Sequence, residues 1–273
     1  MKSLPNVITE LMFLRGSIKY INYLLFSRHS HGHGIHSPFV FELVSGVFRN
    51  KTEPDIVLLI ENIRKRYTSD KTIIQVNDLG SGSVITRKGT GRVCDIAKYS
   101  SVPVRYGILL SNLASVYGMP SVIEYGTAIG ISTMYLASGR RDSVIYTMEG
   151  CLSLSSVAAE NFRQAGFENI TQMTGHFDES TKELKDKGVK PGLVFIDGNH
   201  RKEPLLKYFS EMADISDTNT VIVIDDIHLS REMEEAWDTI KQFDNVSFTI
   251  DLFRMGLVFF RKGISRFHYV IRY

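Results

Sequence analysis

Cysteine is scarce in this sequence. The 273 residues include only Cys94 and Cys151, which are too few for a disulfide framework and are not spaced as a metal knuckle or a redox pair. We therefore expect an intracellular, reducing setting.

Long apolar runs are lacking as well. The charged residues Arg15, Lys19 and Arg28 interrupt the apolar N-terminal segment, and Glu10 falls where the apolar region of a signal peptide would lie. We expect no membrane span and no export, and we predict a cytoplasmic protein.

The sequence has no excess of charge of one sign. It contains 32 basic and 30 acidic residues, for a formal net charge of +2. Such a balance provides no global field for a polyanion, so nucleic acid is not the expected ligand. With 43% hydrophobic and 23% charged residues, the composition is that of a globular protein with room for one large domain or one domain and an appendage.

The N-terminal segment has apolar residues at alternating steps of four and three, which predicts an amphipathic helix. These residues are Val7, Leu11, Leu14, Ile18, Ile21 and Leu25. Their stripe is expected to dock either on the same chain or on a second copy in a homodimer, with a membrane surface as the less favoured partner. The loop that follows carries several histidines between His29 and His36, but its glycines leave the imidazoles unpositioned. We interpret it as a solvated or subunit-contact loop rather than a metal site.

From residue 121 onward, short apolar runs alternate with amphipathic stretches of helix length, which is typical of repeated βα units. The predicted parallel strands are 121–123, 144–146, 170–173, 193–196 and 221–224, and the predicted helices are 132–137, 154–165, 180–187, 203–213 and 230–243. The runs 246–252 and 257–261 predict an antiparallel hairpin. We predict a Rossmann-like three-layer α/β sandwich with a mostly parallel, seven-stranded sheet and a C-terminal hairpin. It occupies residues 119–273 and follows a helical and flap region over residues 1–118.

A glycine-containing turn follows the first predicted strand, in the sequence Glu124-Tyr-Gly-Thr-Ala-Ile-Gly-Ile-Ser132. Gly126 and Gly130 permit a tight turn and the close approach of a ligand, and Ser132 is expected to cap the next helix. Glu149 ends the second strand, where its carboxylate is placed to accept two hydrogen bonds from ribose hydroxyls. The pattern indicates a site for an adenosine-type ligand.

The turn differs from a dinucleotide fingerprint, G-x-G-x-x-G, because Ala128 holds the second glycine position. Glu124 would repel a pyrophosphate and would attract the ammonium group of S-adenosylmethionine. Over residues 119–262 the chain resembles class I S-adenosylmethionine-dependent methyltransferases in this turn, in Glu149 and in the terminal hairpin. The resemblance implies a methyltransferase fold, with Glu149 at the cofactor's ribose. It implies a cofactor-binding set of Glu124, Gly126, Thr127, Gly130, Ser132, Glu149, Gly150, Gly175, His176 and Asp197, with Gly126, Thr127 and Gly130 at the methionine part and Gly175 and His176 at the adenine.

Acidic residues also end two later strands. Asp197 follows residues 193–196, Asp225 and Asp226 follow residues 221–224, and His200 and His228 come shortly after. The carboxyl ends of parallel strands meet at one edge of a sheet, so these side chains are expected to converge. Carboxylate oxygens suit Mg²⁺, Ca²⁺ or Mn²⁺. We hypothesise a divalent cation at this edge.

This arrangement resembles O-methyltransferases of the catechol and caffeoyl-coenzyme A type, which implies Asp197, Asp225 and Asp226 as the metal ligands. Asp226 stands where that family has asparagine, and His200 stands where it has lysine. A metal would acidify a coordinated hydroxyl, and His200 or His228 would take its proton before attack on the methyl group. The expected function is O-methylation of a small-molecule hydroxyl, with Asp197, His200 and His228 as catalytic residues.

Two other functions stay open: methyl transfer to another nucleophile, such as an amine or RNA, and a non-catalytic cofactor-binding or interaction role. Methylation of amines in bases or glutamine typically uses an Asn-Pro-Pro-Tyr-like turn, where this chain has Asp197-Gly-Asn-His200. The basic stretch 87–92 is the only feature that favours RNA. A second glycine-rich stretch, Asp78–Ser83, does not lead into an apolar helix, and we interpret it as a turn or flap near the substrate entrance.

Overall fold

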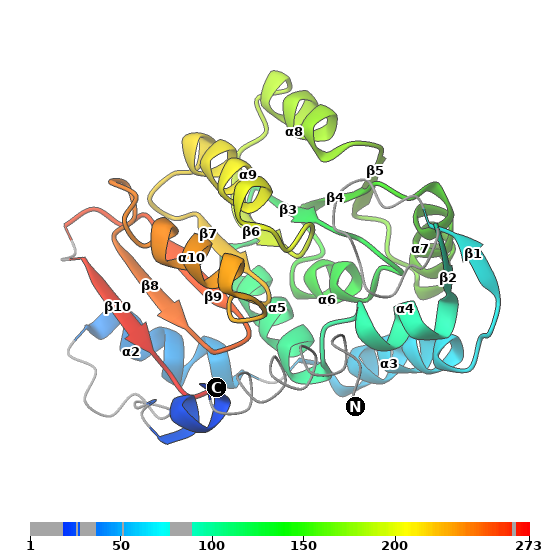
Figure 1. The fold of residues 1–273 in the computed structure, drawn as a ribbon, viewed down its shortest axis with the longest axis horizontal. Helices are drawn as coiled ribbons and strands as arrows, with labels where there is room; N and C mark the ends of the chain where they lie inside the picture. The colour runs from blue at the N-terminus through cyan, green and yellow to red at the C-terminus, as the bar shows by residue number, and fades with distance from the viewer. Residues whose placement is uncertain (1–18, 26, 28–36, 51, 77–88, 264–265) are drawn as a thin grey trace, which may run out of the picture.

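The fold is built on one mostly parallel sheet of eight strands (Figure 1). A computed structural model of the chain describes residues 19–25, 27, 37–50, 52–76, 89–263 and 266–273. The strands of this sheet are β3 (Ser121–Tyr125), β4 (Val144–Glu149), β5 (Ile170–Thr174), β6 (Pro191–Ile196), β7 (Val221–Ile224), β8 (Phe248–Asp251), β9 (Gly256–Phe259) and β10 (Phe267–Val270). Their order across the sheet is β10-β8-β9-β7-β6-β3-β4-β5.

The predicted parallel strands and the predicted hairpin are confirmed. Strands β3 to β7 pair in parallel, and β6 and β7 are buried along their whole length, as expected of strands covered on both faces. Strands β8 and β9 pair antiparallel, from Phe248 opposite Phe259 to Asp251 opposite Gly256. Because β9 lies between β7 and β8, the turn of this hairpin returns to the carboxyl end of β7.

The predicted number of strands, seven, is one too low. The additional strand, β10, pairs in parallel with β8 at the edge of the sheet, with Phe267 opposite Phe248. Most of its side chains are exposed. It therefore lacks the buried apolar pattern by which the other strands are recognised in the sequence.

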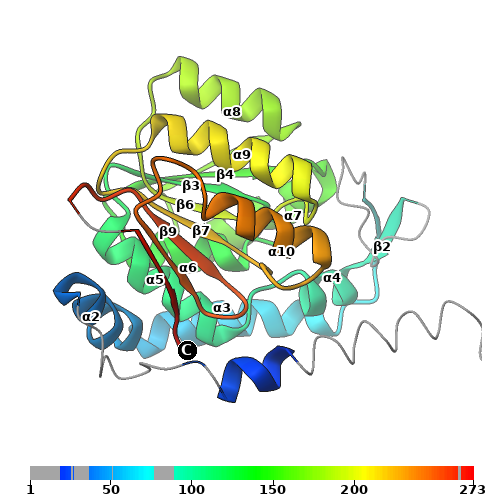
Figure 2. The same cartoon turned by 60° about the vertical axis from the view of Figure 1, so that its left-hand side comes forward.

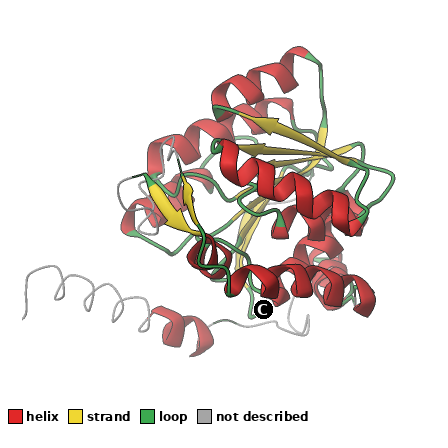
Figure 3. Ribbon diagram, turned by 90° about the vertical axis from the view of Figure 1, so that its right-hand side faces the viewer, coloured by secondary structure: helices red, strands yellow, loops and turns green. Residues whose placement is uncertain are grey.

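Helices cover both faces of the sheet and form the predicted three-layer sandwich (Figures 2 and 3). One face is packed through a cluster that includes Phe209 and Trp237, and the other through a cluster that includes Leu109 and Phe162. The first layer consists of α8 (Phe177–Asp186), α9 (Lys202–Ile215) and α10 (Arg231–Ile240), and the second contains α5 (Val104–Tyr117), α6 (Ile131–Gly139) and α7 (Leu152–Ala165).

The region before residue 119 contributes further elements to the second layer. Helix α5 lies along α6, and the hydroxyls of Ser111 and Ser138 share a hydrogen bond of 3.2 Å between them. A single hydrophobic cluster includes residues from both sides of the predicted boundary at residue 118, which stays a prediction. The earlier elements are α2 (Pro38–Ser45), η1 (Val47–Arg49), α3 (Pro54–Thr68), β1 (Ile73–Gln75), β2 (Thr90–Arg92) and α4 (Val93–Tyr99), with β1 and β2 forming an antiparallel ribbon.

The described part of the N-terminal helix, residues 19–25, packs on its own chain through a residue outside the predicted stripe. Ile21 and Leu25, which belong to the predicted stripe, are 54% and 70% exposed. Tyr23 is buried instead, and its hydroxyl donates to the carbonyl of Ile271 at 2.7 Å and accepts from the amide of Tyr273 at 2.9 Å. Packing of this segment on its own chain therefore depends on Tyr23 and the C-terminus.

Other predictions for the N-terminal half lie outside the described residues. They concern the stripe from Val7 to Ile18, the loop with His29 to His36, and the glycine-rich stretch Asp78–Ser83. Within the described ranges, no helix is both long enough and apolar enough to cross a membrane.

Candidate functional site

The predicted turn after β3 lies at the carboxyl edge of the parallel strands. Gly126 has φ +97°, and a Cβ there would lie 2.7 Å from the carbonyl oxygen of Asp197. Gly130, with φ +84°, precedes the first residue of α6, and a Cβ there would lie 2.4 Å from the ring of Phe162. Only glycine fits these two positions without strain. The prediction that Ser132 caps α6 is wrong, because the helix begins at Ile131 and Ser132 lies within its first turn.

Glu124 lies beneath this turn and has no exposed surface. Its carboxylate accepts hydrogen bonds from the hydroxyls of Thr133 and Thr147, the latter at 2.7 Å. The hydroxyl of Thr127 also points beneath the turn, where it shares a hydrogen bond of 2.6 Å with Thr147. Burial raises the pKa of Glu124, and hydrogen bonds from the hydroxyls of Ser132, Thr133 and Thr147 lower it. The result is a pKa of about 7. These bonds join Glu124 to α6 and β4, and its place among the cofactor-binding residues stays a prediction.

Glu149, at the end of β4, holds the same turn from the neighbouring strand. Its Oε2 accepts a hydrogen bond from the amide of Ala128 at 2.8 Å, and its Oε1 accepts one from the amide of Cys151 at 2.9 Å. Burial raises the pKa of Glu149, and these amides together with that of Gly150 lower it. The thiol of Cys151 donates in turn to the carbonyl of Gln75, so the ribbon formed by β1 and β2 borders this part of the edge. A carboxylate has about four acceptor positions, and the amides of Ala128 and Cys151 take two of those of Glu149.

The predicted adenine residues lie next to Glu149. The amide of Gly175 donates to the backbone carbonyl of Glu149 at 3.0 Å, which joins the ends of β4 and β5. Gly175 has φ +142°, and His176 takes the position that precedes α8. The structure thus brings Gly150, Gly175 and His176 together at one end of the edge.

An acidic cluster with a cation inside it occupies the other end of the edge. Asp197 follows β6, and Asp225 and Asp226 follow β7. Asp225 has no exposed surface, and it pairs with Arg254 through Nε to Oδ1 at 2.9 Å and Nη2 to Oδ2 at 2.6 Å. The Nη2 atom of Arg254 also lies 3.5 Å from Oδ1 of Asp226.

Burial and mutual repulsion raise the pKa values of two of the three aspartates. Burial raises the pKa of Asp197 well above its ordinary value, and the charges of Asp225 and Asp226 raise it further, while Arg254 lowers it. Burial, followed by the charge of Asp225, raises the pKa of Asp226 to about 7. The cluster therefore requires compensating positive charge or bound protons.

As arranged here, the three aspartates do not fit a divalent ion. Both oxygens of Asp225 are taken by the guanidinium of Arg254, which stands where a shared ion would bind. No group of three acidic, histidine or cysteine side chains with metal-site geometry occurs among residues that the structure describes. Arg254 could not be recognised from the sequence. It lies in the hairpin turn, 29 positions after Asp225, and belongs to no motif.

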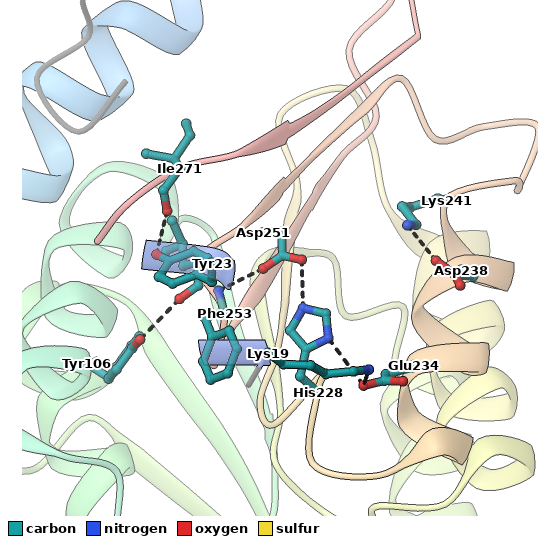
Figure 4. A network of polar contacts seen from close by, with 11 residues as sticks. Lys19, Tyr23, Tyr106, His228, Glu234, Asp238, Lys241, Asp251, Phe253 and Ile271 are labelled. Atoms are coloured by element: carbon teal, nitrogen blue, oxygen red, sulfur yellow. Dashed lines mark hydrogen bonds and ion pairs between the residues drawn. The ribbon is translucent and has the colours of Figure 1, made fainter. Parts of the chain in front are cut away.

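The two predicted histidines lie in different surroundings. The Nε2 atom of His200 is 3.7 Å from Oδ1 of Asp197. Burial lowers the pKa of His200, which keeps its imidazole neutral near pH 7. The Nε2 atom of His228 is instead 2.8 Å from Oδ2 of Asp251 at the end of β8, and its ring packs against Phe253 (Figure 4). Of the two, His200 is the one joined to the acidic cluster.

Residues 123–227 match a family model described as a methyltransferase domain. The likeness to methyltransferase domains lies in this part of the chain. This part contains Glu124, the turn after β3, Glu149, Asp197 and the Asp225-Asp226 pair, which are the residues that gather at the carboxyl edge.

Curated proteins similar to this part of the chain carry O-methyltransferase names. A protein named catechol O-methyltransferase from Niastella koreensis is 29% identical over 130 residues, which cover 46% of this chain and 58% of that protein. The chain thus spans a little more than half the length of the curated relatives it matches.

Solved structures of similar fold extend over more of the chain. The SAH-bound methyltransferase of Podospora anserina aligns with a TM-score of 0.58 at 15% identity, covering 83% of this chain and 97% of that one. The O-methyltransferase of Bacillus cereus in complex with SAH aligns with a TM-score of 0.55 at 18% identity, covering 81% and 97%. At these identities the likeness establishes the Rossmann-like methyltransferase fold, with the predicted sheet and hairpin.

Proposed function

We propose that the chain is an S-adenosylmethionine-dependent methyltransferase that transfers a methyl group to a hydroxyl oxygen of a small molecule. The observation that carries this proposal is the geometry of Glu149. Its carboxylate is tied to the turn after β3 through the amide of Ala128, at the carboxyl edge where open α/β sheets bind ligands. The O-methyltransferase names of the relatives support oxygen as the methyl acceptor.

The residues at the edge fit S-adenosylmethionine. Gly126 and Gly130 leave two positions of the turn without side chains, where a ligand can approach the backbone, and the carboxylate of Glu149 would accept from ribose hydroxyls. Gly175 and His176 border the adjoining end of the edge, where the adenine would lie. Asp197, beside Gly126, would attract the ammonium group of the methionine part. Glu124 joins α6 and β4 beneath the turn.

When it is bound, S-adenosylmethionine supplies an electrophilic methyl group on a sulfonium. His200 is the proposed base, because its neutral imidazole lies at the end of β6 beside Asp197. It takes the proton of the acceptor hydroxyl as the oxygen bonds to the methyl carbon and the carbon–sulfur bond breaks. In its ionised form, Asp197 stabilises the imidazolium that forms. His228 is not chosen as the base, because it lies beside Asp251 at the end of β8 and outside the acidic cluster.

The divalent cation predicted from the sequence is not part of this proposal, because Arg254 already pairs with both oxygens of Asp225. A cytoplasmic setting stays a prediction, and the free thiols of Cys94 and Cys151 agree with it. A homodimer through the N-terminal helix also stays a prediction.

A methyl-transfer assay tests the proposal. Purified chain is incubated with labelled S-adenosylmethionine and separate pools of small phenols and alcohols, of amines, and of RNA, and the products are identified by mass spectrometry. We expect transfer to a hydroxyl compound, with a large loss of kcat in His200→Asn and none in the matched variant His268→Asn on β10. Methylation of amines or RNA alone would replace the proposed acceptor, and cofactor binding without any transfer would indicate the non-catalytic alternative.

A further inference from the structure

The acidic cluster requires compensating positive charge or bound protons. Asp197, Asp225 and Asp226 converge at the ends of two adjacent strands, and Asp225 is fully buried. Uncompensated carboxylates are costly in such a place, because neither water nor distance screens their repulsion. Whatever supplies the positive charge therefore determines how this end of the site works.

Arg254 supplies that charge in a fixed geometry. Its guanidinium grips Asp225 with two donors, Nε and Nη2, and Nη2 extends toward Asp226. Its backbone carbonyl accepts a hydrogen bond from the amide of Ile227 at 3.1 Å. Arg254 is thus joined to the segment after β7 by both its side chain and its backbone, and planar two-donor pairing of this kind is strong and directional.

The turn that carries Arg254 is held from several sides (Figure 4). The amide of Phe253 donates to Oδ1 of Asp251 at 2.7 Å, and the hydroxyl of Tyr106 on α5 donates to the carbonyl of Leu252 at 3.1 Å. The ring of Phe253 lies 5.1 Å from the ring of Tyr23 in the N-terminal helix. Phe253 itself adopts φ +70°, which a non-glycine residue keeps only when its surroundings impose it. These contacts prevent the guanidinium from swinging freely out of the cluster.

We propose that the Arg254 guanidinium takes the place of a divalent cation in this site and supplies a single positive charge there, so that the chain binds no metal at Asp197, Asp225 and Asp226. A guanidinium compensates the carboxylates but offers no open coordination position. The acceptor hydroxyl is then deprotonated by His200 alone, without a metal ion to acidify it. This last consequence rests on the proposed methyl transfer, whereas the exclusion of metal does not.

Metal binding to the native chain tests the proposal directly. Mn²⁺ is titrated into the protein and followed by electron paramagnetic resonance of the free ion, with and without S-adenosylmethionine. We expect no saturable binding at millimolar Mn²⁺, and the same cofactor affinity in excess chelator as in excess Mg²⁺. Saturable binding that disappears in Asp225→Asn would overturn the proposal.

The variant Arg254→Met removes the built-in charge. It should unfold at a lower temperature than the native chain, and Mn²⁺ should now bind and restore part of the lost melting temperature. The matched variant Arg261→Met, at the other end of the same hairpin, removes a guanidinium that lies over the ring of Phe39 and should gain no Mn²⁺ binding. A folded Arg254→Met chain with native melting temperature and no Mn²⁺ affinity would contradict the assigned role.

One further variant covers the case in which Arg254→Met fails to fold. If Arg254→Met does not fold, Arg254→Lys retains the charge without the two-donor geometry, and the titration of the native chain still decides. If the native chain excludes Mn²⁺ but transfers no methyl group, the proposed function fails while the assignment of Arg254 stands.

Discussion

Replacing Glu124 with glutamine is expected to remove a pH-dependent part of the free energy of unfolding. The Glu124 carboxyl group has no exposed surface, and burial raises its pKa from 4.5 to about 7. At about 1.4 kcal/mol for each pKa unit, this shift corresponds to about 3 kcal/mol. Glutamine keeps the size of the side chain and an acceptor for Thr147, but it has no proton to lose.

Whether stability rises or falls with pH depends on which state of the chain binds the Glu124 proton more tightly. The folded chain holds the Glu124 proton more tightly than the unfolded chain does. The resulting stabilisation is fully present below pH 4.5 and is lost as the pH rises through about 7. Between about pH 5 and pH 8, the native chain should therefore lose about 2 to 3 kcal/mol of stability relative to Glu124→Gln. The free energy of unfolding of Glu124→Gln, relative to that of the native chain, should therefore be greater at pH 8 than at pH 5.

Urea unfolding followed by circular dichroism at both pH values measures this difference. Asp226, whose pKa is also raised, is present in both proteins, so its effect cancels in the comparison. The pKa of Asp197 is raised mainly by burial and by Asp225 and Asp226, and the charge of Glu124 adds the last and smallest of the causes. The exposed substitution Glu168→Gln is the matched control and should parallel the native chain. A gap between the native chain and Glu124→Gln that stays the same at both pH values would refute the reasoning.

Three other substitutions test separate parts of the structure. Gly130→Ala should lower the free energy of unfolding by about 1–3 kcal/mol, because alanine would take a positive φ and meet the ring of Phe162, and an undiminished urea midpoint would contradict this. Tyr23→Phe removes two hydrogen bonds to the C-terminus and should cost about 1–3 kcal/mol in the same assay, whereas the half-exposed Tyr20→Phe should cost little. If neutral His200 is the base, kcat should fall at acidic pH as His200 gains a proton, and because the pKa of His200 is lowered this fall should begin only below pH 6.5. The residual activity of His200→Asn should not show this fall. The same fall in His200→Asn would mean that another group causes it.

The sheet and the turn after β3 were predictable because their signals are local. Buried parallel strands leave continuous apolar runs, such as residues 221–224, and the positive φ angles at Gly126 and Gly130 require residues that the sequence displays openly. Glu149 could be placed because a strand end follows directly from the length of its apolar run. Its hydrogen bonds to the turn could not be predicted, since they depend on how β3 and β4 stagger.

The features that could not be predicted are contacts between residues that lie far apart in the sequence or depend on strand register. Arg254 reaches Asp225 only because β9 lies between β7 and β8, an order that a hairpin pattern does not specify. Glu124 occupies a strand end, yet its side chain points beneath the turn toward Thr147, and the direction of a side chain depends on the register of the strand. Tyr23 contacts the C-terminus, nearly the whole chain away.

Calorimetric titration of S-adenosylmethionine into the native chain and into Glu149→Gln tests the central claim most directly. We expect saturable binding to the native chain and an affinity about 10- to 100-fold weaker in Glu149→Gln. The substitution removes a charged acceptor for the ribose and for the amides of Ala128 and Cys151. The exposed control Glu168→Gln should bind like the native chain. Absence of binding to the folded native chain, or equal affinity in Glu149→Gln, would contradict the account.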